Sequence, residues 1–163
     1  MSRAMIRTGI GFDTHRFAEG RKLILGGVEI EHAQGLDGHS DADVLTHAVI
    51  DALLGAVADG DIGTHFPDTD DTWRDADSID LLRATCVRLE AATIVNVDAT
   101  IVAERPKLAG HIDAMRARLA DAMGLEPARV SVKATTAETM GALGREEGIA
   151  AIAIATVNQP EAG

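Results

Sequence analysis

The chain changes from strand-like to helix-like patterning at residues 40–56, which read SDADVLTHAVIDALLGA. Within this stretch the apolar residues recur every three or four positions, which is the spacing of one helix face. These residues are Leu45, Val49, Ala52, Leu53 and Ala56. Ser40 followed by Asp43 three residues later resembles a capping box, so we expect the helix to begin at Ser40.

Strands are predicted on both sides of this helix, from alternating patterns and a buried apolar run. They are residues 6–15, 23–25, 28–30, 95–103, 130–134 and 148–157. Further helices are expected at 79–89, at 108–122 and as a short turn near Glu138. Pro106 would open the second of these helices and Gly124 would end it. Residues 1–163 are therefore expected to form one α/β domain of the α+β kind, in which a mixed β-sheet packs against helices.

The composition is that of a folded protein with an acidic surface. The 163 residues are 46% hydrophobic and carry a net charge of -11, which opposes binding to nucleic-acid phosphates. The single cysteine, Cys86, excludes an intrachain disulfide. Neither the first residues nor the run at 148–157 has the apolar length of a signal peptide or a membrane helix. We therefore expect a cytoplasmic protein that binds neither nucleic acid nor a membrane.

Residues 58–78 lack a regular pattern and contain seven aspartates. A connection of this length inside a compact domain is usually functional or disordered. Gly60, Gly63, Phe66 and Pro67 favour an ordered loop, whereas the alternative is a solvated acidic excursion. This loop is the first place to look for a site.

Asp13 and His15 lie two residues apart on a predicted strand, so both side chains leave the same face and can reach one ion. The same spacing arises by chance in a chain rich in aspartate, as in Asp37 and His39. His47 lies on the predicted helix, where a lone histidine is more often a core residue than a ligand. If His47 does join the pair, two imidazoles and one carboxylate make a zinc site with one open position.

Two predicted strand-to-helix junctions could hold phosphate. Residues 133–138 read KATTAE, and Glu138 could bind Mg²⁺ together with substrate phosphates. A capping box between Thr135 and Glu138 would explain the same residues without a ligand. At residues 103–107, which read AERPK, Lys107 is available for phosphate. The charged residues 145–147 are most simply a solvated surface.

Short motifs along nearly the whole chain occur in the order known from one enzyme family. They are GFDTHRF (11–17), LGGV (25–28), HSDADV (39–44), DALLGA (51–56), GDIG (60–63), FPDTD (66–70), PK (106–107), KATT (133–136) and GIA (148–150). On these motifs the chain closely resembles the 2-C-methyl-D-erythritol 2,4-cyclodiphosphate synthase family of the methylerythritol phosphate route to isoprenoids.

The resemblance implies a homotrimer around a threefold axis, with active sites between neighbouring subunits. It implies zinc on Asp13, His15 and His47, and Mg²⁺ or Mn²⁺ that bridges Glu138 and the substrate diphosphate. The substrate would be the cytidine diphosphate compound 4-diphosphocytidyl-2-C-methyl-D-erythritol 2-phosphate. Its 2-phosphate would attack the β-phosphorus, and CMP would leave.

The resemblance also assigns the remaining site residues. The family positions that orient and stabilise the phosphates are matched by His39 and Thr136, with Ser40 beside them. The loop over the methylerythritol group is matched by Asp61, Gly63, Phe66, Asp68 and Asp70. The cytidine pocket of the adjacent subunit is matched by Ala103, Lys107, Leu108, Ala109 and Thr135. Arg145 matches a charged residue beside an apolar cavity on the threefold axis, where the family often has Phe and this chain has Ala142.

Two other functions stay open at the level of sequence. A zinc hydrolase would use the metal to activate water against a phosphate ester or a diphosphate. A trimeric regulator would bind a nucleotide without turnover and would need no open zinc position.

Overall fold

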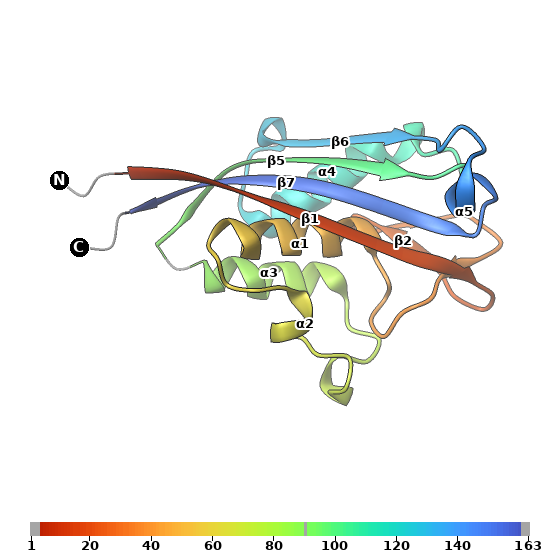
Figure 1. Cartoon of the computed structure of the whole chain (residues 1–163), viewed down its shortest axis with the longest axis horizontal. Helices are drawn as coiled ribbons and strands as arrows, with labels where there is room; N and C mark the ends of the chain where they lie inside the picture. The colour runs from red at the N-terminus through yellow and green to blue at the C-terminus, as the bar shows by residue number, and fades with distance from the viewer. Residues whose placement is uncertain (1–3, 90, 161–163) are drawn as a thin grey trace.

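A computed structural model describes residues 4–89 and 91–160, and its main feature is a mixed five-stranded sheet (Figure 1). The strand order is β4-β1-β7-β5-β6, and only β5 and β6 run parallel. The bounds are β1 Ala4–Ala18, β4 Gly35–Leu36, β5 Thr93–Val102, β6 Val130–Thr135 and β7 Gly148–Pro160. The hairpin β2 (Leu23–Leu25) and β3 (Val28–Ile30) forms a separate two-stranded sheet. The predicted α+β domain with a mixed sheet is confirmed.

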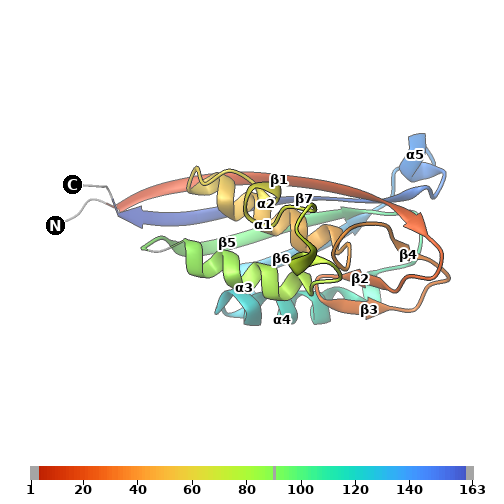
Figure 2. The same ribbon diagram turned by 90° about the horizontal axis from the view of Figure 1, so that it is seen from below.

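The long helices cover one face of the sheet, as Figure 2 shows. They are α1 (Val44–Ala56), α3 (Ser78–Arg88) and α4 (Ile112–Met123). The shorter elements are α2 (Ile62–His65), α5 (Gly141–Gly144), η1 (Asp71–Trp73), η2 (Ala109–His111) and η3 (Pro127–Arg129). No helix within the described residues is long and apolar enough to cross a membrane.

Gly9 and Gly11 allow α1 to lie directly on β1. A Cβ atom at Gly9 would come within 2.0 Å of the Ala52 carbonyl oxygen, and one at Gly11 within 1.9 Å of the Ala48 carbonyl oxygen. No side chain fits at such distances in a close-packed interior. Because strand residues two apart share a face, the glycines and Asp13 face the same helix. This close approach brings β1 and α1 together where the candidate ligands lie.

The helix at residues 44–56 begins later than predicted, so the expected start at Ser40 is wrong. Asp43 is the N-cap, and its fully buried carboxylate accepts from the Thr46 N–H at 3.0 Å and the Thr46 hydroxyl at 2.7 Å. The same carboxylate accepts from the N–H groups of Gly26 and Gly27 in the β2–β3 turn. Asp43 therefore caps α1 and holds the hairpin at the same time, a role that the capping pattern alone did not indicate.

The other helix boundaries also needed tertiary information. Pro106 does not open α4, because the short turn η2 at Ala109–His111 comes first and the helix begins at Ile112. Gly124 ends α4 as predicted, with a left-handed φ of 65°. The short helical turn expected near Glu138 is present as α5, but it begins at Gly141, and Glu138 itself has a left-handed φ of 53° in the loop between β6 and α5.

The sheet face opposite the long helices is apolar along β1 and β7. Ile10 and Phe12 pair across the strands with Ile154 and Ile152, and all four side chains are exposed. The exposed fractions of Ile10 and Phe12 are 69% and 59%. Large exposed apolar patches of this kind usually mark an interaction surface.

Candidate active site

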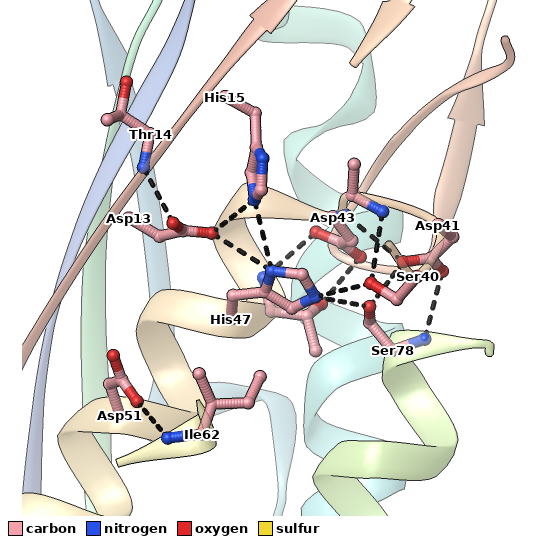
Figure 3. Close-up of polar contacts among 12 residues, drawn as sticks. Asp13, Thr14, His15, Ser40, Asp41, Asp43, His47, Asp51, Ile62 and Ser78 are labelled. Carbon is pink, nitrogen blue, oxygen red and sulfur yellow. Dashed lines mark hydrogen bonds and ion pairs between the residues drawn. The ribbon is translucent and has the colours of Figure 1, made fainter. Parts of the chain in front are cut away.

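Asp13 and His15 on β1 meet His47 on α1 in one cluster (Figure 3). Asp13 Oδ2 lies 2.8 Å from His15 Nε2 and 3.0 Å from His47 Nδ1, and the two ring nitrogens are 3.4 Å apart. A tetrahedral zinc site with bonds of about 2.0–2.1 Å places its donor atoms about 3.3 Å apart. The cluster therefore matches the donor types and approximates the spacing of a three-ligand metal site, and it brings His47 to the pair predicted on the strand.

The protein also holds the second nitrogen of each imidazole. His15 Nδ1 donates to the carbonyl oxygen of Asp37 at 2.7 Å, which leaves Nε2 free for a metal. His47 uses the opposite nitrogen, because its Nε2 lies 2.8 Å from Ser78 Oγ and 3.1 Å from Ser40 Oγ. Outer partners of this kind orient metal-binding imidazoles and select their tautomers. The described residues therefore fit a divalent metal such as zinc.

The charges of the cluster are mutually dependent. Burial alone opposes ionisation of Asp13, but hydrogen bonds and positive charge from His15 and His47 outweigh it and hold the pKa of Asp13 well below its usual range. Burial opposes protonation of His15, but the Asp13 carboxylate outweighs burial and raises the pKa of that imidazole. A cation is therefore favoured at this point, whether it is a proton or a metal ion.

A cavity of about 410 Å³ opens beside the cluster, and we call it the metal-side cavity. It contains five other residues that the resemblance assigned to the site: His39, Ser40, Gly63, Phe66 and Asp68. It is also lined by Gly38, Ile62, Trp73 and Leu81, which the sequence analysis did not single out. Phe66 and Trp73 pack edge to face with ring centroids 5.1 Å apart, so the ordered loop expected at 58–78 is confirmed.

His39 Nε2 is a distinctive group in this cavity. It is buried and has no hydrogen-bond partner among residues 4–89 and 91–160. A buried polar atom of this kind is costly unless a ligand or water satisfies it. The free nitrogen is therefore available to a bound molecule.

Asp61 and Asp70 do not line the metal-side cavity. Asp61 caps α2 by accepting from the Thr64 N–H at 2.8 Å, and Asp70 caps η1 by accepting from the Thr72 N–H at 2.9 Å. These hydrogen bonds lower the pKa of both carboxyl groups. Asp51 on α1 accepts from the Ile62 N–H at 2.7 Å and so attaches the loop to the helix that carries His47.

A second cavity of about 300 Å³ lies beside the C-terminal ends of β5 and β6, and we call it the strand-end cavity. Its lining includes the predicted nucleotide residues Ala103, Lys107, Leu108, Ala109 and Thr135, together with Thr136. Glu104, Pro106 and Ala134, which belong to the predicted junctions at 103–107 and 133–138, also line it, and Ile112 is the one lining residue that sequence reasoning missed. The two cavities share no lining residue, so the single chain does not bring His39 and Thr136 into a common cavity.

Glu138 and Arg145 line neither of these cavities. Glu138 is exposed on the β6–α5 loop, whose Ala137 and Thr139 N–H groups both donate to Glu104 Oε1 at 3.0 Å. Glu104 therefore supplies the acceptor that a capping box would have supplied. The capping-box interpretation of Thr135 and Glu138 is wrong. Arg145 is exposed and donates to Glu147 Oε1 at 2.7 Å.

The YgbB family model matches residues 6–158 of the chain. The 2-C-methyl-D-erythritol 2,4-cyclodiphosphate synthase of Halalkalibacterium halodurans is 59% identical over 152 residues, which are 92% of this chain and 97% of that protein. The synthase of Salinibacter ruber is 58% identical over 154 residues, which are 93% of this chain and 98% of that protein.

Solved structures show the same fold. The bifunctional IspDF from Campylobacter jejuni is 40% identical, with a TM-score of 0.93, over 96% of this chain but only 43% of that protein. The CDP complex of IspF from Plasmodium falciparum is 30% identical, with a TM-score of 0.82, over 96% of this chain and 97% of that one.

Proposed function

Because the chain belongs to the YgbB family of 2-C-methyl-D-erythritol 2,4-cyclodiphosphate synthases, we propose that it converts 4-diphosphocytidyl-2-C-methyl-D-erythritol 2-phosphate to the cyclic diphosphate and CMP. In this reaction an oxygen of the 2-phosphate attacks the β-phosphorus, the new P–O bond closes the ring, and the bond to the CMP oxygen breaks. The observation that carries the proposal is the cluster of Asp13, His15 and His47 beside a cavity that contains His39.

Asp13, His15 and His47 would hold zinc, and Glu138 would hold Mg²⁺ or Mn²⁺ with the substrate diphosphate. Bound cations supply positive charge that reduces the repulsion between the two phosphate groups. His39 would orient a phosphate through its free Nε2, with Ser40 beside it. Because the substrate carries its own nucleophile, the protein has to hold it in line, and effective molarity supplies on the order of 7–11 kcal/mol.

The remaining residues would bind the two ends of the substrate. Gly63, Phe66 and Asp68 line the metal-side cavity and would contact the methylerythritol group, and Asp61 and Asp70 would shape the same loop as caps. The strand-end cavity would hold the cytidine, with Lys107 and Thr136 near the phosphates. Its lining suits recognition by backbone and small side chains. Arg145 would remain on the surface beside Glu147.

The division of the site into two cavities supports a homotrimer in which neighbours complete each active site. A substrate that touches both cavities would need the metal-side cavity of one subunit and the strand-end cavity of the next. The exposed apolar face of β1 and β7 supplies a surface for this assembly. Cyclic assembly around one axis gives every subunit the same pair of neighbours.

Turnover in ¹⁸O-labelled water tests the reaction. A cyclase gives CMP and cyclic diphosphate without label, because water never attacks phosphorus. The second candidate is a hydrolase in which His39, with its unpartnered Nε2, activates water as a general base. Label in CMP or in an open-chain bisphosphate would support the hydrolase, whereas nucleotide binding without any product would support a regulator.

A further inference from the structure

A chain of polar contacts leads from His47 away from the metal cluster (Figure 3). His47 Nε2 lies 2.8 Å from Ser78 Oγ, and Ser78 Oγ makes a hydrogen bond to Asp41 Oδ1. The other oxygen of Asp41 accepts from the Ser78 N–H at 3.0 Å. These polar contacts join three segments of the protein, namely α1, the first residue of α3 and the connection that precedes α1.

The chemistry of these groups determines the direction of the hydrogen bonds. The Asp41 carboxylate can only accept, and Ser78 has a single hydroxyl proton. Ser78 therefore donates its hydroxyl hydrogen bond to Asp41 and accepts a hydrogen bond from the N–H group at His47 Nε2. With the proton on Nε2, the lone pair of His47 is on Nδ1, the nitrogen that faces Asp13 and His15.

Because these side chains are buried, the protein and not the solvent supplies the hydrogen-bond partner of His47 Nε2. Ser78 is fully buried, and Ser40 and His47 are 7% and 8% exposed. Solvent has little access to replace the Ser78 oxygen. His15 differs, because its outer partner is the backbone carbonyl of Asp37, which no side-chain substitution removes. Side chains therefore control the tautomer of His47, whereas a backbone carbonyl controls that of His15.

We propose that Asp41 and Ser78 form a positioning relay that keeps the proton on His47 Nε2 and so presents Nδ1 to the metal. The inference rests on the metal site of the proposed function and adds two residues to it. Ser40 Oγ also lies 3.1 Å from Nε2, but the carboxylate behind Ser78 is what sets the direction. Outer partners of metal-binding histidines typically change metal affinity 10- to 100-fold.

The chain offers a matched control for a purely structural role. Thr46 is also fully buried, and its hydroxyl donates to Asp43 at a helix start, as the Ser78 hydroxyl donates to Asp41. Thr46→Val therefore removes a similar buried hydrogen bond without removing a partner of the His47 ring. Ser78→Ala removes the relay and leaves the bond between the Asp41 carboxylate and the backbone N–H of residue 78.

The experiment measures zinc release from the loaded protein to an excess of chelator. Release from Ser78→Ala should be about 10- to 100-fold faster than from wild type, and release from Thr46→Val should stay within about twofold of wild type. Asp41→Asn gives a second test if Ser78→Ala does not fold. Its amide can donate to Ser78 Oγ, which turns the Ser78 proton towards His47 and opposes the required tautomer, so release should again be faster.

Proton NMR of the zinc-loaded protein supplies a readout that a structural role would not move. The proton on His47 Nε2 should exchange slowly with solvent in wild type and Thr46→Val, and measurably faster in Ser78→Ala, where the ring keeps this proton but loses its Ser78 acceptor. The His15 Nδ1 proton should persist in all three proteins as an internal reference.

Unchanged release from both Ser78→Ala and Asp41→Asn would overturn the relay while leaving the metal site intact. Release from Thr46→Val as fast as from Ser78→Ala would also overturn it, because a general loosening of the helix starts would then suffice. A wild-type protein that takes up no zinc would instead refute the metal assignment, and the relay with it.

Discussion

The metal-side cavity and the strand-end cavity are built in opposite ways. The first gathers a carboxylate and imidazoles whose outer atoms have fixed partners, such as Asp37 for His15 and Ser78 for His47. The second is lined largely by small or apolar residues, including Ala103, Leu108 and Ala134. Ionic chemistry therefore depends on side-chain identity in the first cavity, whereas binding depends on shape and backbone in the second.

This difference predicts different consequences of substitution. Removing a ligand from the metal-side cavity removes a function outright, because no neighbouring group can replace it. Filling the strand-end cavity weakens binding by a graded amount.

His47→Ala should abolish zinc retention and lower turnover by about a thousandfold or more, because lost metal stabilisation is worth several kcal/mol. Elemental analysis and product formation measure the two effects. His39→Ala is the control, since it should keep its zinc while losing turnover. Full metal content in His47→Ala, or equal loss in both variants, would contradict the ligand set.

Glu138→Gln should lower turnover about 100-fold at limiting Mg²⁺, because the amide lacks the charge that a hard cation prefers. Glu138 is exposed, so the melting temperature and the zinc content should stay close to wild type. Activity assays over a range of Mg²⁺ concentrations measure the effect. If Glu138→Gln kept wild-type turnover at low Mg²⁺, Glu138 would not be a ligand of the second cation.

Ala134→Leu should fill part of the strand-end cavity and raise the KM for the cytidyl substrate about tenfold, which corresponds to about 1.4 kcal/mol. Zinc content should not change, because the two cavities share no lining residue. Steady-state kinetics and calorimetry with CMP measure the loss.

Mixing subunits shows whether the two cavities complete one another. His47→Ala and Ala134→Leu chains are assembled in equal amounts into mixed trimers, which are assayed at a substrate concentration too low for Ala134→Leu alone. Random assortment around the axis should then recover about a quarter of wild-type activity. No recovery in verified mixed trimers would place each complete site within one chain.

Asp51→Ala should raise KM a few-fold and lower stability by about 1 kcal/mol, because the Ile62 N–H loses its acceptor. Asp51→Asn keeps an acceptor oxygen and should behave more like wild type. Burial raises the pKa of Asp51, so a neutral side chain suits this position. If the two variants behaved equally, the hydrogen bond from the Ile62 N–H to Asp51 would not be what holds the loop.

Cys86 supplies the smallest effect and reports on α3, the helix that begins at Ser78. Burial raises the pKa of Cys86 to about 11, so alkylation should be slow at pH 8 and should keep accelerating towards pH 11. Because the folded state favours the thiol, the stability that Cys86 contributes is present below pH 9 and is lost as the pH rises towards 11. An alkylation rate that levels off near pH 9 would show that the Cys86 thiol is not shielded from solvent by the packing of α3.

Sequence patterns predicted the elements well wherever the signal was local. Alternation and the apolar run at 148–157 located the long strands, and apolar spacing located α1, α3 and α4, although the starts of α1 and α4 were placed too early and the two-residue β4 was not predicted. The errors arose where a distant group replaced a local partner. Asp43 is shared between α1 and the β2–β3 turn, and Glu104 accepts from the loop that contains Glu138.

The candidate site shows the same division. Asp13 and His15 were identifiable because strand geometry relates residues two apart, and the resemblance added His47 and the loop residues. Asp41 lies in the HSDADV motif, but nothing in the sequence indicated its contact with Ser78, and Ser78 carried no recognisable signal. Serine and aspartate are common at helix starts, and only the packing of α3 against α1 brings Ser78 to the ring of His47.

The strand and helix periodicities, the acidic charge, the single cysteine and the residue types that could bind a metal can all be read from the amino-acid order alone. Which of those residues meet depends on tertiary packing, because the approach of α1 to β1 requires two glycines that lie far from the helix in the sequence. Tertiary packing also decides which nitrogen of each imidazole is free and that the two cavities are separate. Those properties arise from contacts between distant segments, which local patterns do not encode.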